Sequence, residues 1–201
     1  MKKIFLLGSI VILLFTIISY NYFDLDIAIY FKNSYPTFLY IFKLITKLGY
    51  STWILITSIL VFLIYRKTKK NLSQKALFIF SSVAISGLIV DVLKIIFSRA
   101  RPKLYFAEDL YAFHFLEFKT KAAYYSFPSG HSSTALSFAF ALSMLFPKYR
   151  VELLLIGVVV AFSRVVVTAH YLSDILAGGL IGIFISYYIY EKYFKARITN
   201  I

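Results

Sequence analysis

Six apolar stretches constrain the fold of this chain more than any other feature of its sequence. A helix that crosses a bilayer needs about 20 mostly apolar residues. The stretches lie at about Ile4–Tyr20, Ser51–Tyr65, Ala76–Phe97, Ser132–Phe146, Leu153–Thr168 and Tyr171–Tyr190. The sequence therefore predicts an all-α integral membrane bundle of six transmembrane helices, folded as a single domain over residues 1–201.

The composition agrees with a membrane protein and excludes several kinds of site. Hydrophobic residues make up 60% of the chain and the mean hydropathy is +0.78, whereas soluble domains contain roughly 45–50% apolar residues. Cysteine is absent, which excludes a disulfide framework, a thiolate metal site and a cysteine nucleophile.

Two segments near the N-terminus are not simple crossings. Residues 24–47 mix aromatic and aliphatic residues with three lysines, and we interpret part of them as an amphipathic interfacial helix that starts near Pro36. Met1-Lys2-Lys3 before an apolar run has the shape of a secretory signal. That run ends at residues 19–23 without a small-x-small cleavage site, so we expect an uncleaved first helix.

The net charge of +13 is explained by membrane topology better than by nucleic-acid binding. With the N-terminus in the cytoplasm, six crossings place both termini, 12 of the 22 basic residues and two of the nine acidic ones on the cytoplasmic side. The cluster at residues 66–70 is the strongest single marker of that side. We therefore expect no nucleic-acid partner, and the short chain suggests a bacterial inner membrane protein.

Charged groups at the ends of membrane helices have a functional interpretation by default, and three such groups stand out. Residues 94–102 leave the third apolar stretch, residues 126–131 enter the fourth, and residues 163–174 join the fifth to the sixth. In the expected topology all three emerge on the outer face. Distant parts of the sequence therefore bring cations, histidines and a carboxylate to one membrane surface.

The cations and one turn are suited to holding a phosphate. Lys94, Arg101 and Arg164 supply positive charge, and the two arginines can bind phosphate oxygens as planar forks. Ser129 and Gly130 stand at a helix start, where free backbone N–H groups favour an anion. Ser129 can also act as a helix N-cap, and we expect it to do both.

The two histidines and the carboxylate can carry out the chemistry. His170 and Asp174 are four residues apart and would share a face if the segment were helical. The carboxylate could then hold the imidazole tautomer that leaves the other nitrogen free to attack. His131 could donate a proton to the leaving alkoxide. The plainer alternative is that His170 and Asp174 are only a structural pair at a helix start.

These three groups resemble the tripartite signature of the PAP2 (type 2 phosphatidic acid phosphatase) family: Lys-x6-Arg-Pro, Pro-Ser-Gly-His and Ser-Arg-x5-His-x3-Asp. Every defining position is filled, in the family's order. The resemblance implies a lipid phosphate phosphatase in which His170 forms a phosphohistidine and His131 protonates the departing group, without a metal or cofactor. It also implies that the phosphate is bound by Lys94, Arg101, Ser129, Gly130 and Arg164.

Several charged residues have competing interpretations. Lys94 and Arg101 could be a basic helix end near lipid headgroups, an interpretation that we favour for Arg99 and Lys103. We take His114 to be an ordinary loop histidine. Asp91 is one turn before Lys94, so we hypothesise that it holds that lysine in place.

The loop, the substrate and two rival functions remain open. The aromatic-rich segment 99–127 either contacts an acyl chain or headgroup or acts as a lid, or it rests on the membrane surface. The expected partners are membrane lipids and a lipid phosphate, with undecaprenyl pyrophosphate or phosphatidylglycerophosphate leading and lipid A close behind. The rivals are a vanadium haloperoxidase, whose site resembles the PAP2 phosphate site, and a non-enzymatic transporter or lipid-binding protein that uses the charged cluster to hold an anion.

Overall fold

The computed structural model describes residues 2–34 and 36–199, and these residues form helices without a β-strand. Met1, part of the signal-like N-terminus, lies outside the described residues. The α-helices are α1 (Lys2–Tyr22), α2 (Asp24–Lys32), α3 (Pro36–Ile45), α4 (Ser51–Tyr65), α5 (Lys70–Phe97), α6 (Pro102–Glu108), α7 (Gly130–Leu145), α8 (Arg150–Val166), α9 (Leu172–Ile189) and α10 (Lys195–Thr199). Shorter turns are η1 (Thr46–Gly49), η2 (Ala122–Tyr124), η3 (Pro147–Tyr149) and the π-helical η4 (Tyr190–Phe194).

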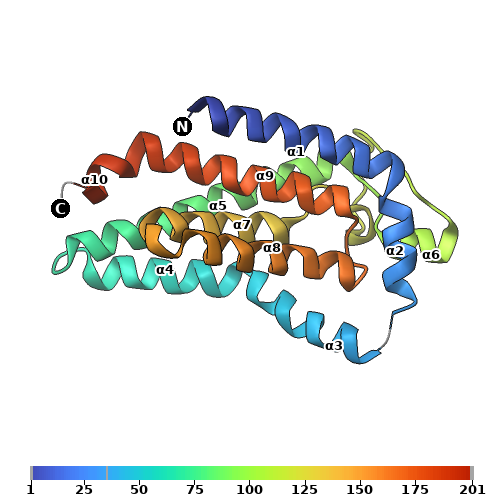
Figure 1. Ribbon diagram of the computed structural model, residues 1–201, viewed down its shortest axis with the longest axis horizontal. Helices are drawn as coiled ribbons and strands as arrows, with labels where there is room; N and C mark the ends of the chain where they lie inside the picture. The colour runs from blue at the N-terminus through green and yellow to red at the C-terminus, as the bar shows by residue number, and fades with distance from the viewer. Residues whose placement is uncertain (1, 35, 200–201) are drawn as a thin grey trace.

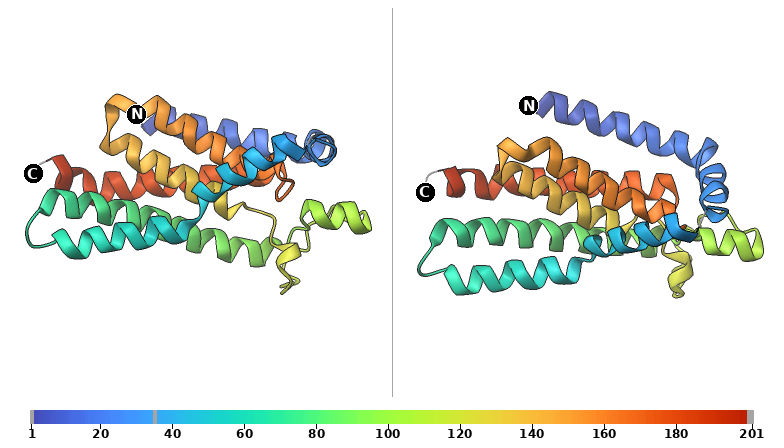
Figure 2. Two further views of the ribbon diagram at one scale, coloured as in Figure 1. Left: turned by 90° about the horizontal axis from the view of Figure 1, so that it is seen from below. Right: turned by 60° about the horizontal axis from the view of Figure 1, so that its bottom comes forward.

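The long helices lie side by side as an elongated bundle (Figure 1). Helix α1 begins and α10 ends at the same end of the bundle, together with the turn between α4 and α5. Helices α2 and α6 lie at the opposite end, and both further views agree with this arrangement (Figure 2). The bundle therefore has two chemically distinct ends, one with the termini and one with the segments that carry the candidate site.

Helix α7 is the centre of the bundle and packs against α5, α8 and α9. Its contact with α9 is close because α9 presents glycines there. A Cβ added at Gly178 would stand 2.3 Å from the backbone oxygen of Ser129, and one at Gly182 would stand 2.4 Å from that of Ser133. Small residues at such positions let two helix backbones approach. This packing fixes the start of α7 against the start of α9.

The six predicted apolar stretches agree with the observed helices to within three residues at each end, except that α5 begins at Lys70, six residues before the predicted Ala76. Helix α10 was not expected. Helix α2 was also not expected, and it follows α1 across a bend of 64°. The segment 99–127, which we interpreted as a loop, contains the short helix α6 and the turn η2. The helix start predicted near Pro36 is confirmed by α3.

Among residues 2–34 and 36–199, three helical stretches are long and apolar enough to cross a membrane: Thr37–Tyr65, Lys70–Glu108 and Leu172–Ile198. The bent pair Leu6–Tyr22 and Asp24–Lys32 would be a fourth. Helices α7 and α8, with 16 and 17 residues, are shorter than the about 20 residues of a typical crossing. The bundle is also covered by large exposed apolar side chains, such as Leu7 on α1 and Leu88 on α5, which suits contact with lipid.

Candidate active site

The turn before α7, which we predicted to bind phosphate, is held in place by α9. The backbone N–H of Ser129 donates to the Asp174 carbonyl at 3.0 Å. Ser129 itself is the N-cap of α7: its hydroxyl accepts from the Ser132 backbone N–H at 3.4 Å. The expected cap is thus confirmed, and the free N–H groups of the first turn remain directed toward the site.

Lys94 lies directly beside this turn. A Cβ on Gly130 would stand 2.9 Å from the Lys94 Nζ, so only glycine lets the ammonium approach the helix start so closely. Lys94 Nζ also donates to Asp91 Oδ1 at 2.8 Å, which confirms the predicted pair within α5. The charge of Lys94 is therefore held at the positive end of α7, where an anion is favoured.

The two arginines reach the same end of the bundle from different elements. Arg101 Nη2 donates to the Tyr125 carbonyl at 3.2 Å, and Arg164 Nη1 donates to Thr46 Oγ1 at 3.0 Å. Both side chains and Lys94 lie within electrostatic range of His131. The structure therefore brings the three predicted cations together around one histidine.

Several nitrogen atoms in this cluster have no partner. The Nε atoms of Arg101 and Arg164 and the Nε2 of His131 are buried and make no hydrogen bond within the described part of the chain. Buried polar atoms without a partner carry a desolvation cost. A phosphate bound among them would accept from several of these donors at once.

The tautomer of His170 is fixed by its surroundings. Its side chain is 2% exposed, and its Nδ1 lies 2.8 Å from the Ser126 carbonyl. A carbonyl oxygen can only accept, so Nδ1 carries the proton and Nε2 carries the lone pair. His170 lies between α8 and α9, and burial lowers its pKa to about 4. The ring is therefore neutral at pH 7 with a free nucleophilic nitrogen.

Asp174 supports this arrangement differently from our expectation. His170 is not helical, because α9 begins at Leu172, so the helical face assumed for the pair does not exist. His170 Nδ1 is still 3.5 Å from Asp174 Oδ2. The same oxygen accepts from Ser126 Oγ at 2.6 Å and from the Tyr171 backbone N–H at 2.8 Å. Asp174 therefore positions Ser126, which in turn orients the imidazole.

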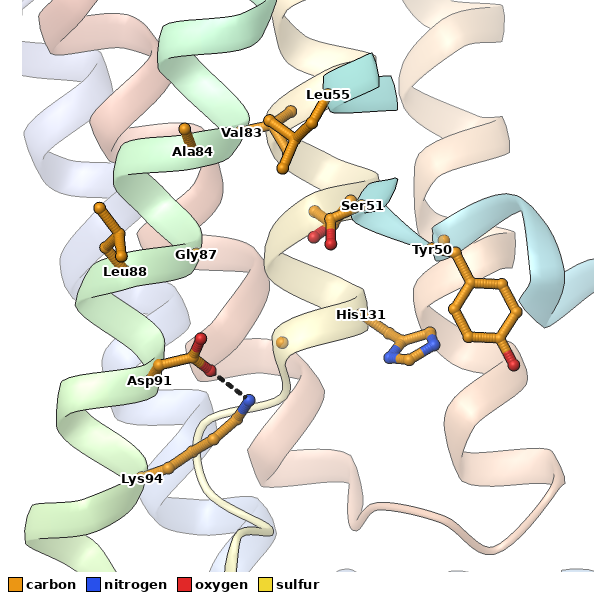
Figure 3. Close-up of a pocket in the computed structure, with 13 residues that line it drawn as sticks. Tyr50, Ser51, Leu55, Val83, Ala84, Gly87, Leu88, Asp91, Lys94 and His131 are labelled. Carbon is orange, nitrogen blue, oxygen red and sulfur yellow. Dashed lines mark hydrogen bonds and ion pairs between the residues drawn. The ribbon is translucent and has the colours of Figure 1, made fainter. Parts of the chain in front are cut away.

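His131 lies at the mouth of a cavity between α4, α5 and α7. The cavity has a volume of about 380 Å³ and is lined by Gly49, Tyr50, Ser51, Leu55, Val83, Ala84, Gly87, Leu88, Asp91, Lys94, Gly130, His131 and Thr134. The Asp91–Lys94 pair on α5 and His131 on α7 lie toward the same end of the cavity (Figure 3). The ring of Tyr50 lies next to His131, with ring centroids 5.0 Å apart. The apolar wall of Leu55, Val83 and Leu88 leads away from the histidine. The cavity thus joins the cluster of Lys94 and His131 to an apolar surface.

The interpretation of Arg99 as a headgroup-facing helix end is wrong. Arg99 is fully buried, and its guanidinium pairs with Asp24 at 2.8 Å and with Asp174 at 2.5 Å. Sequence reasoning missed Asp24 altogether. Asp24 follows the first apolar stretch, and charges at the ends of membrane helices are functional by default. We applied that rule only to the charged groups at residues 94–102, 126–131 and 163–174. Lys103 is exposed, and His114 is a loop histidine paired with Glu117.

Part of the aromatic segment packs inward, which neither interpretation of it anticipated. The rings of Tyr111 and Phe113 stand 5.2 Å and 4.9 Å from the guanidinium carbon of Arg99. Phe97 packs against Phe113 and Phe127 with centroids 6.0 Å and 5.1 Å apart. This part of the segment therefore covers Arg99.

Within residues 2–34 and 36–199, no group of three or more His, Cys, Asp or Glu side chains has an arrangement that could hold a metal ion. The donors of the site are instead ammonium, guanidinium, imidazole and backbone N–H groups. Their chemistry suits an anion.

Comparisons with known proteins point in the same direction. The chain matches the PAP2 superfamily over residues 75–198. It is 37% identical over 156 residues to the lipid A 1-phosphatase of Rhizobium johnstonii, covering 72% of this chain and 63% of that protein. It is 30% identical over 154 residues to the lipid A 4'-phosphatase of Porphyromonas gingivalis, covering 73% and 63%. The chain thus spans about 63% of the length of these relatives.

A solved structure shares the fold. The crystal structure of a PAP2-type phosphatidylglycerolphosphate phosphatase from Bacillus subtilis matches with a TM-score of 0.64 and 23% sequence identity, covering 91% of this chain and 94% of that one. All three predicted signature groups lie inside the part of the chain that matches the superfamily.

Proposed function

The chain belongs to the PAP2 superfamily, and we propose that it removes phosphate from a membrane lipid with His170 as the nucleophile. The observation that carries the proposal is the fixed tautomer of His170: the Ser126 carbonyl, 2.8 Å from Nδ1, leaves the lone pair on Nε2. That nitrogen stands in a cluster with Arg101 and Arg164, which lie within electrostatic range of His170. A neutral imidazole beside such cations is a nucleophile next to a phosphate-binding site.

In the first step His170 Nε2 attacks the phosphorus, a P–N bond forms and the bond from phosphorus to the leaving oxygen breaks. His131 gives its proton to that oxygen, which leaves as an alcohol or, from a pyrophosphate, as a phosphate. His131 must enter this step as an imidazolium, because a neutral ring would have to become an anion, and we propose that the negative charge of the bound phosphate stabilises that form. Lys94, Arg101, Arg164 and the N–H groups that follow Ser129 stabilise the negative charge on the equatorial phosphate oxygens.

In the second step a water molecule attacks the phosphohistidine. His131, now neutral, takes the proton of that water, a P–O bond forms, and the P–N bond breaks to return the free His170 lone pair. Inorganic phosphate leaves and His131 is protonated again. The cycle uses only side chains of this chain and water, and we propose that it needs no metal.

We further propose that six helices cross the membrane, α1, α4, α5, α7, α8 and α9, with α3 at the interface. The site would face the outer side of a bacterial inner membrane. In support, the basic cluster at residues 66–70 joins α4 to α5 at the end of the bundle that holds the termini (Figure 1). Positive charge on connecting segments marks the cytoplasmic side.

The substrate proposed is an amphiphile whose phosphate sits at headgroup depth. His131 protonates the leaving group, so the lipid part must leave on the His131 side, where the apolar cavity begins. The two relatives named as lipid A phosphatases bring lipid A to the front of our candidates, ahead of undecaprenyl pyrophosphate and phosphatidylglycerophosphate.

The test is phosphate release by the purified protein in detergent with EDTA, across these lipids. His170→Ala should abolish release, while His114→Ala should retain it, because His114 lies outside the site and pairs with Glu117. Release that depends on an added divalent ion would refute the metal-free mechanism. A folded wild-type protein that releases no phosphate from any of the lipids would refute the proposed function.

A further inference from the structure

Arg99 is not among the residues proposed to bind the phosphate. It is the largest fully buried side chain in the described part of the protein. It follows Ser98, which ends α5 in the left-handed conformation at φ 41°. Four aromatic rings surround it, with the Tyr171 ring nearest at 4.4 Å. The chain thus encloses a full positive charge away from both water and substrate.

Two carboxylates compensate this charge from opposite sides. Arg99 Nη2 donates to Asp24 Oδ2 at 2.8 Å, and Arg99 Nη1 donates to Asp174 Oδ1 at 2.5 Å. Ser173 lies between them, accepting from Arg99 Nη1 at 2.7 Å and donating to Asp24. A buried ion pair is weak evidence for stability, because desolvation offsets the attraction. The contacts of Asp174 with other residues of the site indicate that the ion pair has a role other than stability.

Arg99 controls Ser126 through two separate routes. The Ser126 backbone N–H donates to the Arg99 carbonyl at 3.1 Å. The Ser126 hydroxyl donates at 2.6 Å to Asp174, the carboxylate that Arg99 holds. Ser126 is the residue whose carbonyl fixes the proton of His170 on Nδ1. The Arg99 guanidinium is therefore connected to the nucleophile through two intermediate residues, Asp174 and Ser126.

Asp24, from a different part of the chain, accepts a hydrogen bond from Nη2 of this guanidinium. It stands at the first position of α2, next to the 64° bend after α1. It accepts from Ser19 Oγ at 2.8 Å and from the Ser173 backbone N–H at 2.9 Å. The N-terminal bent helices are thereby tied to the start of α9.

We propose that Arg99 is a positioning residue for the reaction, anchored by Asp24, and that it orients Asp174 and Ser126 so that His170 presents its Nε2 lone pair to the phosphate. The inference rests on the proposed function. It assigns a role in turnover to the bend between α1 and α2, although no side chain of that bend touches the phosphate site.

The test is a double-mutant cycle between Asp24→Asn and Asp174→Asn, with kcat and KM measured on the best lipid phosphate. Asp24→Asn keeps the shape of the side chain and removes its charge. It should lower kcat about tenfold, which corresponds to about 1.4 kcal/mol at the transition state, and leave KM within about twofold, because no phosphate ligand changes. In the Asp174→Asn background the same substitution should lower kcat by less than about twofold, since Asp174, through which Asp24 and Arg99 act, is already altered.

Controls separate this role from general damage. Lys103→Gln removes an exposed cation close to Arg99 in sequence and should leave kcat unchanged. Thermal unfolding of each variant checks folding. If Asp24→Asn does not fold, Ser173→Ala replaces it in the cycle, because Ser173 bridges Arg99 and Asp24, and kcat should fall about threefold in the same pattern.

The outcomes are distinct. Full kcat in Asp24→Asn would overturn the inference and leave the proposed function intact. A loss of kcat that is equally large in the Asp174→Asn background would overturn it as well, because the effect would not pass through Asp174. A wild-type protein inactive on every lipid phosphate would overturn the proposed function and the inference with it.

Discussion

Gly87 on α5 lines the cavity next to His131, and enlarging it tests whether the lipid part of the substrate lies there. A Cβ at this position meets no atom within 4 Å, so Gly87→Leu should fold. Its side chain projects into a space of about 380 Å³. A leucine adds four carbon atoms and would displace about four methylene groups of a bound chain. At about 0.8 kcal/mol for each buried methylene, the loss is about 3 kcal/mol, or roughly a hundredfold in kcat/KM.

The assay compares a long-chain lipid phosphate with a short-chain analogue that has the same headgroup. Gly87→Leu should reduce kcat/KM for the long-chain substrate by roughly a hundredfold and that for the short-chain one by much less. Gly8→Leu is the matched control, because a Cβ at Gly8 also meets nothing within 4 Å and α1 does not line the cavity. Equal kcat/KM losses for both substrates, or no loss for either, would refute this account of the cavity.

Three further predictions follow from the packing and charges of the site. Gly178→Ala should lower the free energy of unfolding by about 1–3 kcal/mol, since its Cβ would meet a backbone oxygen at 2.3 Å; Gly8→Ala should not, and equal melting temperatures in detergent would contradict the packing. Asp91→Asn should lower kcat/KM by about two- to fivefold, because Lys94 loses an exposed partner; full activity would remove Asp91 from the site. Because burial lowers the pKa of His170 to about 4, its ring should stay neutral from pH 8 to about pH 5 in a nitrogen NMR titration; protonation near the ordinary 6.5 would contradict this burial.

Much of the fold follows from local sequence signals. Helix α4 begins and ends at the predicted residues, Ser51 and Tyr65, because apolar runs bounded by polar turns set helix limits without knowledge of the partners. The same holds for the start of α3 at Pro36. The bend between α1 and α2 could not be predicted in this way, because the sequence there contains no proline or glycine. Its polar residues Asn21, Asp24 and Asp26 lie within the two helices and do not mark a break.

The sequence predicted candidate site residues that lie within short motifs. It did not predict contacts between residues that are distant in sequence. The spacing from His170 to Asp174 indicated a direct pair, whereas the Ser126 carbonyl, 44 residues away in sequence, makes the closer contact. Arg99 and Asp24 are 75 residues apart. No periodicity or motif connects them, since their contact depends on how the end of α5 and the starts of α2 and α9 come together. A charge pair of this kind is visible only after the helices are assembled.

The most direct test of the account is the detection of a phosphate group on His170 during turnover. The protein would be mixed with a lipid phosphate, quenched in alkali within milliseconds to seconds and analysed by peptide mass spectrometry. We predict a phosphorylated peptide that contains His170, accumulating further in His131→Ala when the leaving group is good, since His131 also assists hydrolysis. Phosphate release by wild type with no phosphorylated His170 at any time, or with phosphate on another residue, would contradict the central claim.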